Sequence, residues 1–168
     1  MSSTPHPDTA NRSVGCSVLT VSDTRTPETD KSGQLIQSKL MSQGHRVVDY
    51  HISKDEPAQV RQRVMDWVKR SDIEAILLNG GTGIAPRDTT YEAIAALLTK
   101  TLPGFGELFR MLSYEQIGSR AMASRAIAGL CETTLIFSMP GSSKAVELAM
   151  DALILPELQH LTAQMAGK

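Results

Sequence analysis

Residues 75–98, AILLNGGTGIAPRDTTYEAIAALL, decide the fold class. The apolar run at 75–78 predicts a short buried strand, because strands that are covered on both faces are apolar throughout. Glycines at positions 80, 81 and 83 end this strand, and helical spacing follows from Thr90 to Leu98. A strand that passes through a tight glycine loop into a helix is typical of βαβ units.

The same alternation of strands and helices extends outward from this stretch. Further strands are predicted at 14–21, 45–52, 126–130 and 134–138. Further helices are predicted at 32–41, from Pro57 through Val68, at 105–117, and at 142–155, where the last can continue past Pro156. In the helix at 105–117, we expect the core-facing side chains to be Phe105, Leu108, Met111 and Leu112. This order predicts an α/β fold with a mainly parallel sheet and helices on both faces.

Length and composition limit the possible classes of protein. The chain has 168 residues, and we expect a flexible, polar tail at 1–13 followed by a single folded domain at 14–168. A net charge of −1 and an aromatic content of 4% argue against nucleic acid and membrane surfaces as partners. There is no apolar run of membrane-spanning length and no signal-peptide core, so we expect a cytoplasmic protein. Cys16 and Cys131 lie in apolar stretches and are expected to be buried, reduced thiols.

The loop at 79–93 is the first candidate for chemistry, because open parallel sheets bind ligands at the carboxyl ends of their strands. Its glycines let backbone N–H groups approach an anion, and the helix start behind them adds partial positive charge. Thr89 and Glu92 have the spacing of a capping box, which leaves the Asp88 carboxylate available for Mg²⁺. Alternatively, Asp88 is itself the helix cap, and the neighbouring Arg87 points to solvent.

The loop at 138–150, SMPGSSKAVELAM, repeats this pattern at the end of another strand. It brings Gly141 and Ser142 to a helix start and places Lys144 in the first turn. A cation is unfavourable there because of the helix dipole, and Arg87 occupies a similar position in the first loop. Two such cations indicate a polyanionic ligand, although Ser142 is equally typical of an ordinary N-cap.

Acidic residues follow the two remaining strands at this edge. Ser22 and Asp23 come directly after the strand at 14–21, and Asp23 has no evident capping role. Asp55 and Glu56 follow the strand at 45–52 and precede Pro57. They are either first-turn acids that the helix dipole favours or, for one of them, a partner of Asp88 at a metal ion.

Several stretches together resemble a known family. They are LTVSDTR with DKSG, GGTGIAPRDTTYEA, GFGELFRMLSYEQIG, SRAIAG and TLIFSMPGSSKA, and they cover nearly all of the chain from Val14 to Leu158. The sequence is similar in these stretches to the molybdenum cofactor biosynthesis proteins of the MoaB/MogA type, which are related to the G domain of gephyrin. The GFGELFRMLSYEQIG stretch resembles the MoaB branch.

The resemblance implies a three-layer α/β/α sandwich that forms trimers or hexamers. It implies adenylylation of molybdopterin by Mg-ATP with release of pyrophosphate, after which the product passes to a molybdotransferase. By motif, Asp88 and Asp55 are the catalytic, Mg²⁺-binding acids. The residues expected to bind nucleotide and phosphate are Ser22, Asp23, Gly80, Gly81, Thr82, Gly83, Arg87, Pro140, Gly141, Ser142 and Lys144.

Two other functions fit the same sequence. One is a non-catalytic carrier or scaffold of the pathway that binds molybdopterin or nucleotide, and the other is a phosphate-binding α/β protein outside this pathway. The resemblance implies the activity of a molybdopterin adenylyltransferase. The intact Arg87-Asp88 pair favours this activity over the two alternatives.

Overall fold

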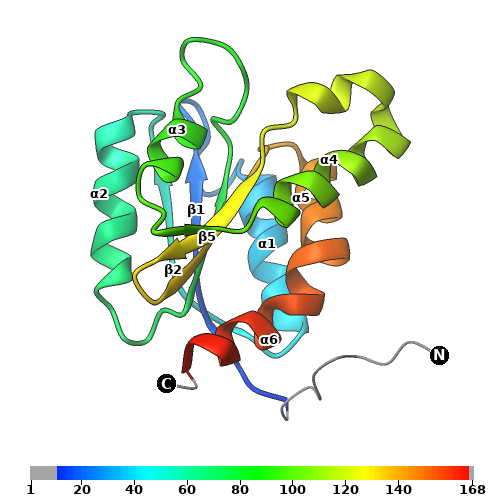
Figure 1. Cartoon of the computed structure of the whole chain (residues 1–168). Helices are drawn as coiled ribbons and strands as arrows, with labels where there is room; N and C mark the ends of the chain where they lie inside the picture. Colours follow the sequence, from blue (N-terminus) through cyan, green and yellow to red (C-terminus); the bar gives the residue numbers. More distant parts are fainter. Residues whose placement is uncertain (1–10, 167–168) are drawn as a thin grey trace, which may run out of the picture.

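A six-stranded sheet forms the centre of the protein (Figure 1). The computed structural model describes residues 11–166, and the strand order is β2–β1–β3–β6–β5–β4. The first four strands in this order run parallel, whereas β5 is antiparallel to both β6 and β4. The bounds are β1 Gly15–Val21, β2 Arg46–Ser53, β3 Ala75–Asn79, β4 Lys100–Thr101, β5 Ile127–Cys131 and β6 Thr134–Met139.

Helices cover both faces of this sheet (Figure 1). Their bounds are α1 Lys31–Ser42, α2 Pro57–Val68, α3 Thr90–Ala95, α4 Pro103–Ile117, α5 Ser143–Ala149 and α6 Leu155–Ala166. A 3₁₀ helix, η1, spans Gly118–Ala123, and a π-helical turn, η2, spans Met150–Ile154. Helix α5 therefore continues through η2 into α6 past Pro156, as predicted. The π-helical turn η2 lies just before Pro156, which has no backbone N–H to donate.

Two hydrophobic cores confirm the three-layer α/β/α prediction. One lies between the sheet and helices α1, α4, α5 and α6, and contains side chains such as Val18, Leu77 and Phe137. The other lies under α2 and α3, where Trp67 and Ile94 pack against Leu78 on the opposite sheet face. Neighbouring residues of β3 alternate between the two cores, so the strand is buried throughout.

Three local features differ from the sequence-based expectation. Helix α3 ends at Ala95 rather than near Leu98, and the two-residue strand β4, which was not predicted, follows it. Strands β5 and β6 form a hairpin, in which Glu132 adopts a left-handed conformation with φ of 53°. The parallel part of the sheet is therefore formed by β2, β1, β3 and β6.

The expected inner face of α4 was partly wrong. Phe105 and Phe109 are buried, and the Phe105 ring lies 5.1 Å from that of Phe137 in an edge-on arrangement. Leu108 and Met111, however, are 46% and 53% exposed. The spacing of apolar residues cannot distinguish a helix face that packs on the sheet from an apolar face that stays exposed on the single chain.

The chain termini and the cysteines complete the description. Most of the predicted tail, residues 1–10, lies outside the described residues, but Arg12 donates hydrogen bonds to Glu74 and to Thr162. Cys16 and Cys131 are buried and free, as predicted, and burial raises the pKa of the Cys16 thiol to about 12. Within residues 11–166, no helix is both long and apolar enough to cross a membrane.

Candidate active site at the carboxyl edge of the sheet

The loops that follow β1, β3 and β6 meet around one cavity of about 470 Å³. The long loop after β3 stands above the ends of the strands in Figure 1. Of the predicted site residues, the cavity brings together Ser22, Gly80, Gly81, Thr82, Gly83, Asp88, Pro140 and Gly141. This convergence follows from the parallel register, because all three strands end at the same edge.

The glycine loop approaches the neighbouring strand ends very closely. Gly80 has a φ of +98° and donates its N–H to the Met139 carbonyl at 3.1 Å. A Cβ atom at this position would lie 2.2 Å from the Val21 carbonyl oxygen, so only glycine fits. The sequence requirement at Gly80 is therefore set by the packing of three strand ends.

Free backbone donors follow this turn. Among the described residues, none accepts a hydrogen bond from the backbone N–H of Gly81, Thr82, Gly83 or Ile84. Three of these four residues line the cavity. Successive unpaired N–H groups in a loop with left-handed glycines are the arrangement that binds phosphate groups in other α/β proteins.

Asp88 is a half-buried acid at the same cavity. Its backbone N–H donates to the Ala85 carbonyl at 2.9 Å, which closes a turn in the loop. Its carboxylate has no hydrogen bond or ion pair with any other part of the described chain, and it lies close to the Gly83 backbone. The carboxylate is therefore available for a cation, as the sequence predicted, although for a different local reason.

The predicted capping box at the start of α3 is wrong. The Thr89 side chain does not cap α3, and Glu92 pairs with Arg125 instead. Asp55 takes the capping role, since its Oδ1 accepts hydrogen bonds from the Thr89 N–H at 3.2 Å and from the Thr89 hydroxyl at 2.8 Å. Asp55 is only 5% exposed and does not line the cavity; its carboxylate lies behind the glycine loop, next to Gly81 and Thr89.

For Arg87 the sequence left open contact with a bound anion or a side chain that points to solvent, and the structure shows a third arrangement, in which carboxylates of the chain pair with it. Its guanidinium binds both oxygens of Asp23 at 2.8 and 2.9 Å and Glu56 Oε1 at 2.8 Å. These contacts lower the pKa of the Asp23 carboxyl to about 2, first through the hydrogen bonds from Arg87. Carboxylates of the protein thus already balance this cation, and neither Arg87 nor Asp23 lines the cavity.

Lys144 and Ser142 are also not part of the cavity. Lys144 is exposed and lines a separate hollow between α4 and α5, beside Glu147 and Asp151. The Ser142 hydroxyl accepts a hydrogen bond from the Ala145 N–H at 3.2 Å. Ser142 therefore has the ordinary N-cap role that remained open from the sequence.

Arg25 is a site residue that sequence reasoning missed. It lines the cavity, and its Nη2 donates to the Gly141 carbonyl at 3.0 Å. Its Nη1 lies 3.4 Å from the buried Asp30, which caps α1 and accepts a hydrogen bond from the Tyr50 hydroxyl at 2.6 Å. The only sequence signal was its place within the SDTR stretch, since its partners lie far along the chain.

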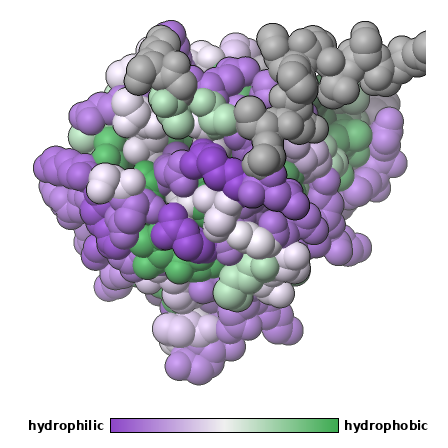
Figure 2. Space-filling model, turned by 90° about the horizontal axis from the view of Figure 1, so that it is seen from below, coloured by the Kyte–Doolittle hydropathy of each residue, from purple (hydrophilic) through white to green (hydrophobic). Residues whose placement is uncertain are grey.

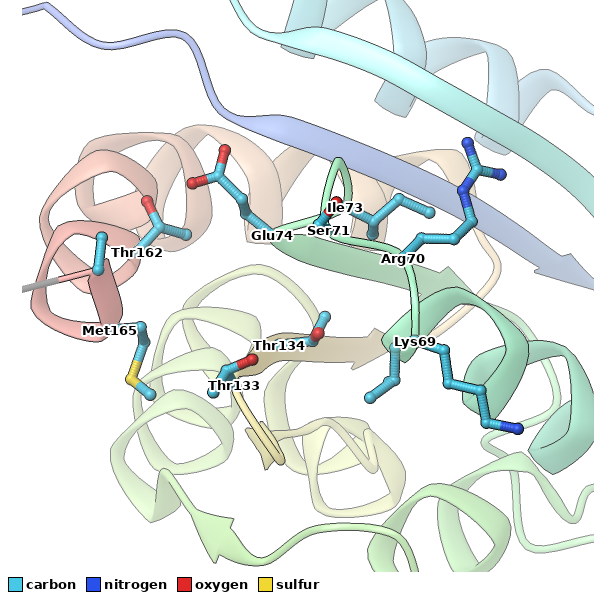
Figure 3. Close-up of a pocket in the computed structure, with 11 residues that line it drawn as sticks. Lys69, Arg70, Ser71, Ile73, Glu74, Thr133, Thr134, Thr162 and Met165 are labelled. Carbon is cyan, nitrogen blue, oxygen red and sulfur yellow. The ribbon is translucent and has the colours of Figure 1, made fainter. Parts of the chain in front are cut away.

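A second cavity, of about 340 Å³, lies at the opposite end of the sheet (Figure 3). Two of its charged residues already have structural partners: Arg70 binds Asp49 and Asp72, and Glu74 accepts from Arg12 and from the Gly15 N–H. Figure 2, which views this end, shows a largely hydrophilic surface with smaller hydrophobic areas. These contacts hold chain segments together, and the convergent loops and free donors lie at the other edge.

Comparison with known proteins agrees with this geometry. Residues 17–160 match the family described as “Probable molybdopterin binding domain”. Molybdenum cofactor biosynthesis protein B of Bacillus cereus is 54% identical over 166 residues, 98% of this chain and 98% of that protein. A crystal structure of molybdenum cofactor biosynthesis protein B superimposes with a TM-score of 0.93 at 53% identity, over 95% of this chain and 100% of that one. The tungsten cofactor synthesizing protein MoaB from Pyrococcus furiosus has a TM-score of 0.83 at 34% identity, over 92% and 98%.

Fold and site together define a three-layer α/β protein with a glycine loop and an unpaired aspartate at the carboxyl edge of its sheet. Within this class, the chain belongs to the MoaB/MogA family of molybdenum cofactor biosynthesis proteins. The relatives at 54% identity are B-type proteins, in agreement with the MoaB branch that the motifs predicted.

Proposed function

We propose that this protein binds Mg-ATP and molybdopterin and transfers the adenylyl group to molybdopterin, releasing pyrophosphate. The observation that supports this most is the combination, at one cavity, of free backbone N–H groups in the glycine loop and the unpaired Asp88 carboxylate. The first can bind phosphate oxygens, and the second can bind the cation that accompanies them.

The donor groups of the chain stabilise negative charge on the phosphates. Backbone N–H groups of Gly81, Thr82 and Gly83 are fixed by the fold before any ligand arrives, so little reorganisation is needed during reaction. Arg25 adds a cation at the same cavity, and its contact with the Gly141 carbonyl holds it toward the loop after β6. Arg87 and Lys144 are left out of direct phosphate binding, because the cavity does not include them.

The reaction needs no acid–base side chain. A phosphate oxygen of molybdopterin attacks the α-phosphorus of ATP, a new P–O bond forms, and the bond to the β-phosphate oxygen breaks with pyrophosphate as the leaving group. The nucleophile is already an anion, so the protein has to align the two phosphates and stabilise the departing charge.

The acids of the site suit Mg²⁺. Among the described residues there is no cluster of three or more potential ligand side chains, and Mg²⁺ commonly takes one or two carboxylates together with substrate phosphates and water. Asp88 offers a free carboxylate, while Asp55 uses Oδ1 to hold Thr89 and keeps Oδ2 beside Gly81. When bound, the ion neutralises charge on the phosphates and on the leaving pyrophosphate.

A single-turnover assay tests this proposal. Purified protein is mixed with molybdopterin and Mg-ATP, and adenylylated molybdopterin is quantified by chromatography. We expect product from the wild type and a loss of about a hundredfold or more in Asp88→Asn, which keeps the size of the side chain but not its charge. Tight molybdopterin binding without product would instead support a carrier or scaffold, and unchanged turnover in Asp88→Asn would contradict the role of Asp88.

We also propose a trimer or hexamer that passes its product to a molybdotransferase. The assembly is supported by a row of exposed apolar side chains on α4 and η1, namely Leu108, Met111, Tyr114, Ile117 and Met122. Exposed apolar side chains gathered on one element are typical of protein–protein contact surfaces.

A further inference from the structure

We infer that Arg125 is a positioning residue, which orients the peptide groups of the glycine loop so that their N–H donors face the anion. Arg125 lies after η1 and before β5, far from the loop in sequence. It does not line the active-site cavity, but a neighbouring hollow that shares only Asp88 with it. The inference rests on the proposed function, because it explains how the phosphate-binding loop obtains its shape.

The Arg125 guanidinium binds two successive carbonyl groups of the loop. Its Nε donates to the Thr82 oxygen at 2.9 Å, and its Nη2 donates to the Gly83 oxygen at 2.6 Å. Arginine is suited to this task, since its planar fork holds several donors in a fixed geometry. Both carbonyl groups are thereby turned toward the same side chain.

The direction of the N–H groups follows from the planarity of the peptide bond. In a trans peptide, the carbonyl of one residue and the N–H of the next point in opposite directions. No peptide bond in the described chain is cis. The contacts of Arg125 with Thr82 and Gly83 therefore turn the N–H groups of Gly83 and Ile84 away from Arg125. Neither N–H has an acceptor within the described residues, so both are free to bind a ligand. Gly83 lines the active-site cavity, and Ile84, the next residue, lines the neighbouring hollow.

Two side chains of α3 hold Arg125 in this position. Glu92 accepts hydrogen bonds from Nη1 and Nη2, and the Tyr91 ring lies under the guanidinium with its centroid 4.9 Å from Cζ. The charge of Arg125 is thus balanced by Glu92 rather than directed at a ligand. This arrangement assigns Arg125 an effect through loop geometry, not through direct attraction of phosphate.

The test uses the full-length chain labelled with ¹⁵N and magnesium pyrophosphate as the probe. Affinity and the amide signals of Gly83 and Ile84 are followed by NMR titration in the wild type, Arg125→Gln and Arg125→Lys. Arg70→Gln is the matched control, since Arg70 is likewise held by acidic side chains, those of Asp49 and Asp72, but lies at the opposite end of the sheet. Thermal unfolding of each variant checks that the fold is kept.

We expect pyrophosphate to shift both amide signals in the wild type and in Arg70→Gln. Arg125→Gln is expected to bind pyrophosphate about tenfold more weakly, the effect of one lost hydrogen-bonding group, with reduced shifts of both signals. Arg125→Lys should stay weakened, because an ammonium group restores the charge without the fork that spans two carbonyls.

Three results would overturn the inference. They are wild-type affinity in Arg125→Gln, full recovery in Arg125→Lys, and pyrophosphate binding that leaves the Gly83 and Ile84 signals in place. If Arg125→Gln does not fold, the Arg125→Lys titration and the wild-type shifts still decide the question. Should the wild type bind pyrophosphate through these amides yet form no adenylylated product, the proposed reaction fails and the role of Arg125 stands.

Discussion

Asp88 is held between two neighbours that are each fixed by residues from other strand ends. Arg87 binds Asp23 and Glu56, and Thr89 binds Asp55. The two anchors also contact each other, because the Asp55 N–H donates to Asp23 Oδ1 at 3.2 Å. Residues of the two loops after β1 and β2 thus restrict the backbone on both sides of one free carboxylate, which limits the conformations that Asp88 can adopt.

The Arg87–Asp23 pair predicts a measurable titration. The Asp23 pKa of about 2 lies below its ordinary value of 3.8, so the folded state favours the ionised form. The contact with Arg87 therefore stabilises the fold fully at any pH above the pKa that Asp23 has in the unfolded chain. This stabilisation is lost as the pH falls through about 2. In Arg87→Gln we expect the pKa of Asp23 to rise toward 3.8, as followed by ¹³C NMR of its carboxyl carbon. A titration that stays near 2 in this variant would show that another group lowers the pKa.

Replacing Gly81 by alanine should lower the free energy of unfolding in two ways, through a steric clash and through backbone strain, and a second glycine allows the two to be separated. Its φ is +66°, and a Cβ atom there would lie 2.1 Å from Thr90 Oγ1 and 2.4 Å from Asp55 Oδ2. Gly44, the matched control, has a φ of +80° but open space around the same position. We expect Gly44→Ala to lower the free energy of unfolding by about 1 kcal/mol through backbone strain alone. Gly81→Ala should cost about 2–4 kcal/mol in urea unfolding, because the clash adds to that strain; equal losses would contradict the close approach.

At the scale of elements, the sequence predicts those strands and loops that have a recognisable pattern of neighbouring residues. Apolar runs identified β1, β3 and the two strands of the hairpin, alternation of apolar and polar residues identified β2, and the glycines after β3 identified the loop. Strand β4 has only two residues, too few for any periodicity, and the hairpin turn has Glu132 where glycine or asparagine would be the usual signal. The contacts of Arg87 join residues 31 and 64 positions apart, and no local pattern carries that information.

The cap of α3 predicts different results for two substitutions of Asp55. Asp55→Ala removes the acceptor of the Thr89 N–H and should lower the free energy of unfolding by about 0.5–2 kcal/mol. Asp55→Asn keeps an oxygen that can accept this hydrogen bond, so we expect a smaller loss of stability. If its charge also serves Mg²⁺, Asp55→Asn should still lower turnover in the single-turnover assay. Ser142→Ala removes the cap of α5 and provides a reference for the loss in free energy of unfolding that one cap accounts for. If Asp55→Asn were as unstable as Asp55→Ala, this result would argue against the capping role of Asp55.

At the scale of the whole molecule, the polar edge of the sheet and the exposed apolar side chains belong to different regions. The loops of the site gather above the strand ends, whereas α4 and η1 project to one side of the sheet (Figure 1). Leu108, Met111, Tyr114 and Ile117 follow one another at intervals of three residues, which spreads them over roughly half of the circumference of α4, the half turned away from Phe105 and Phe109. Its other side carries Phe105 and Phe109 into the core, which makes α4 apolar on two sides.

An apolar second side of α4 predicts self-association through this helix. Sedimentation of the wild type should show a trimer or hexamer, and Leu108→Glu combined with Met111→Glu should shift it to the monomer, because both charges would have to be buried at the contact. The fold should survive, since these side chains are 46% and 53% exposed in the single chain. Met41→Glu is the matched control: Met41 is 58% exposed but lies on α1, so its substitution should leave the oligomer intact. A monomeric wild type, or a double variant that remains an oligomer, would show that the apolar side of α4 does not hold the subunits together.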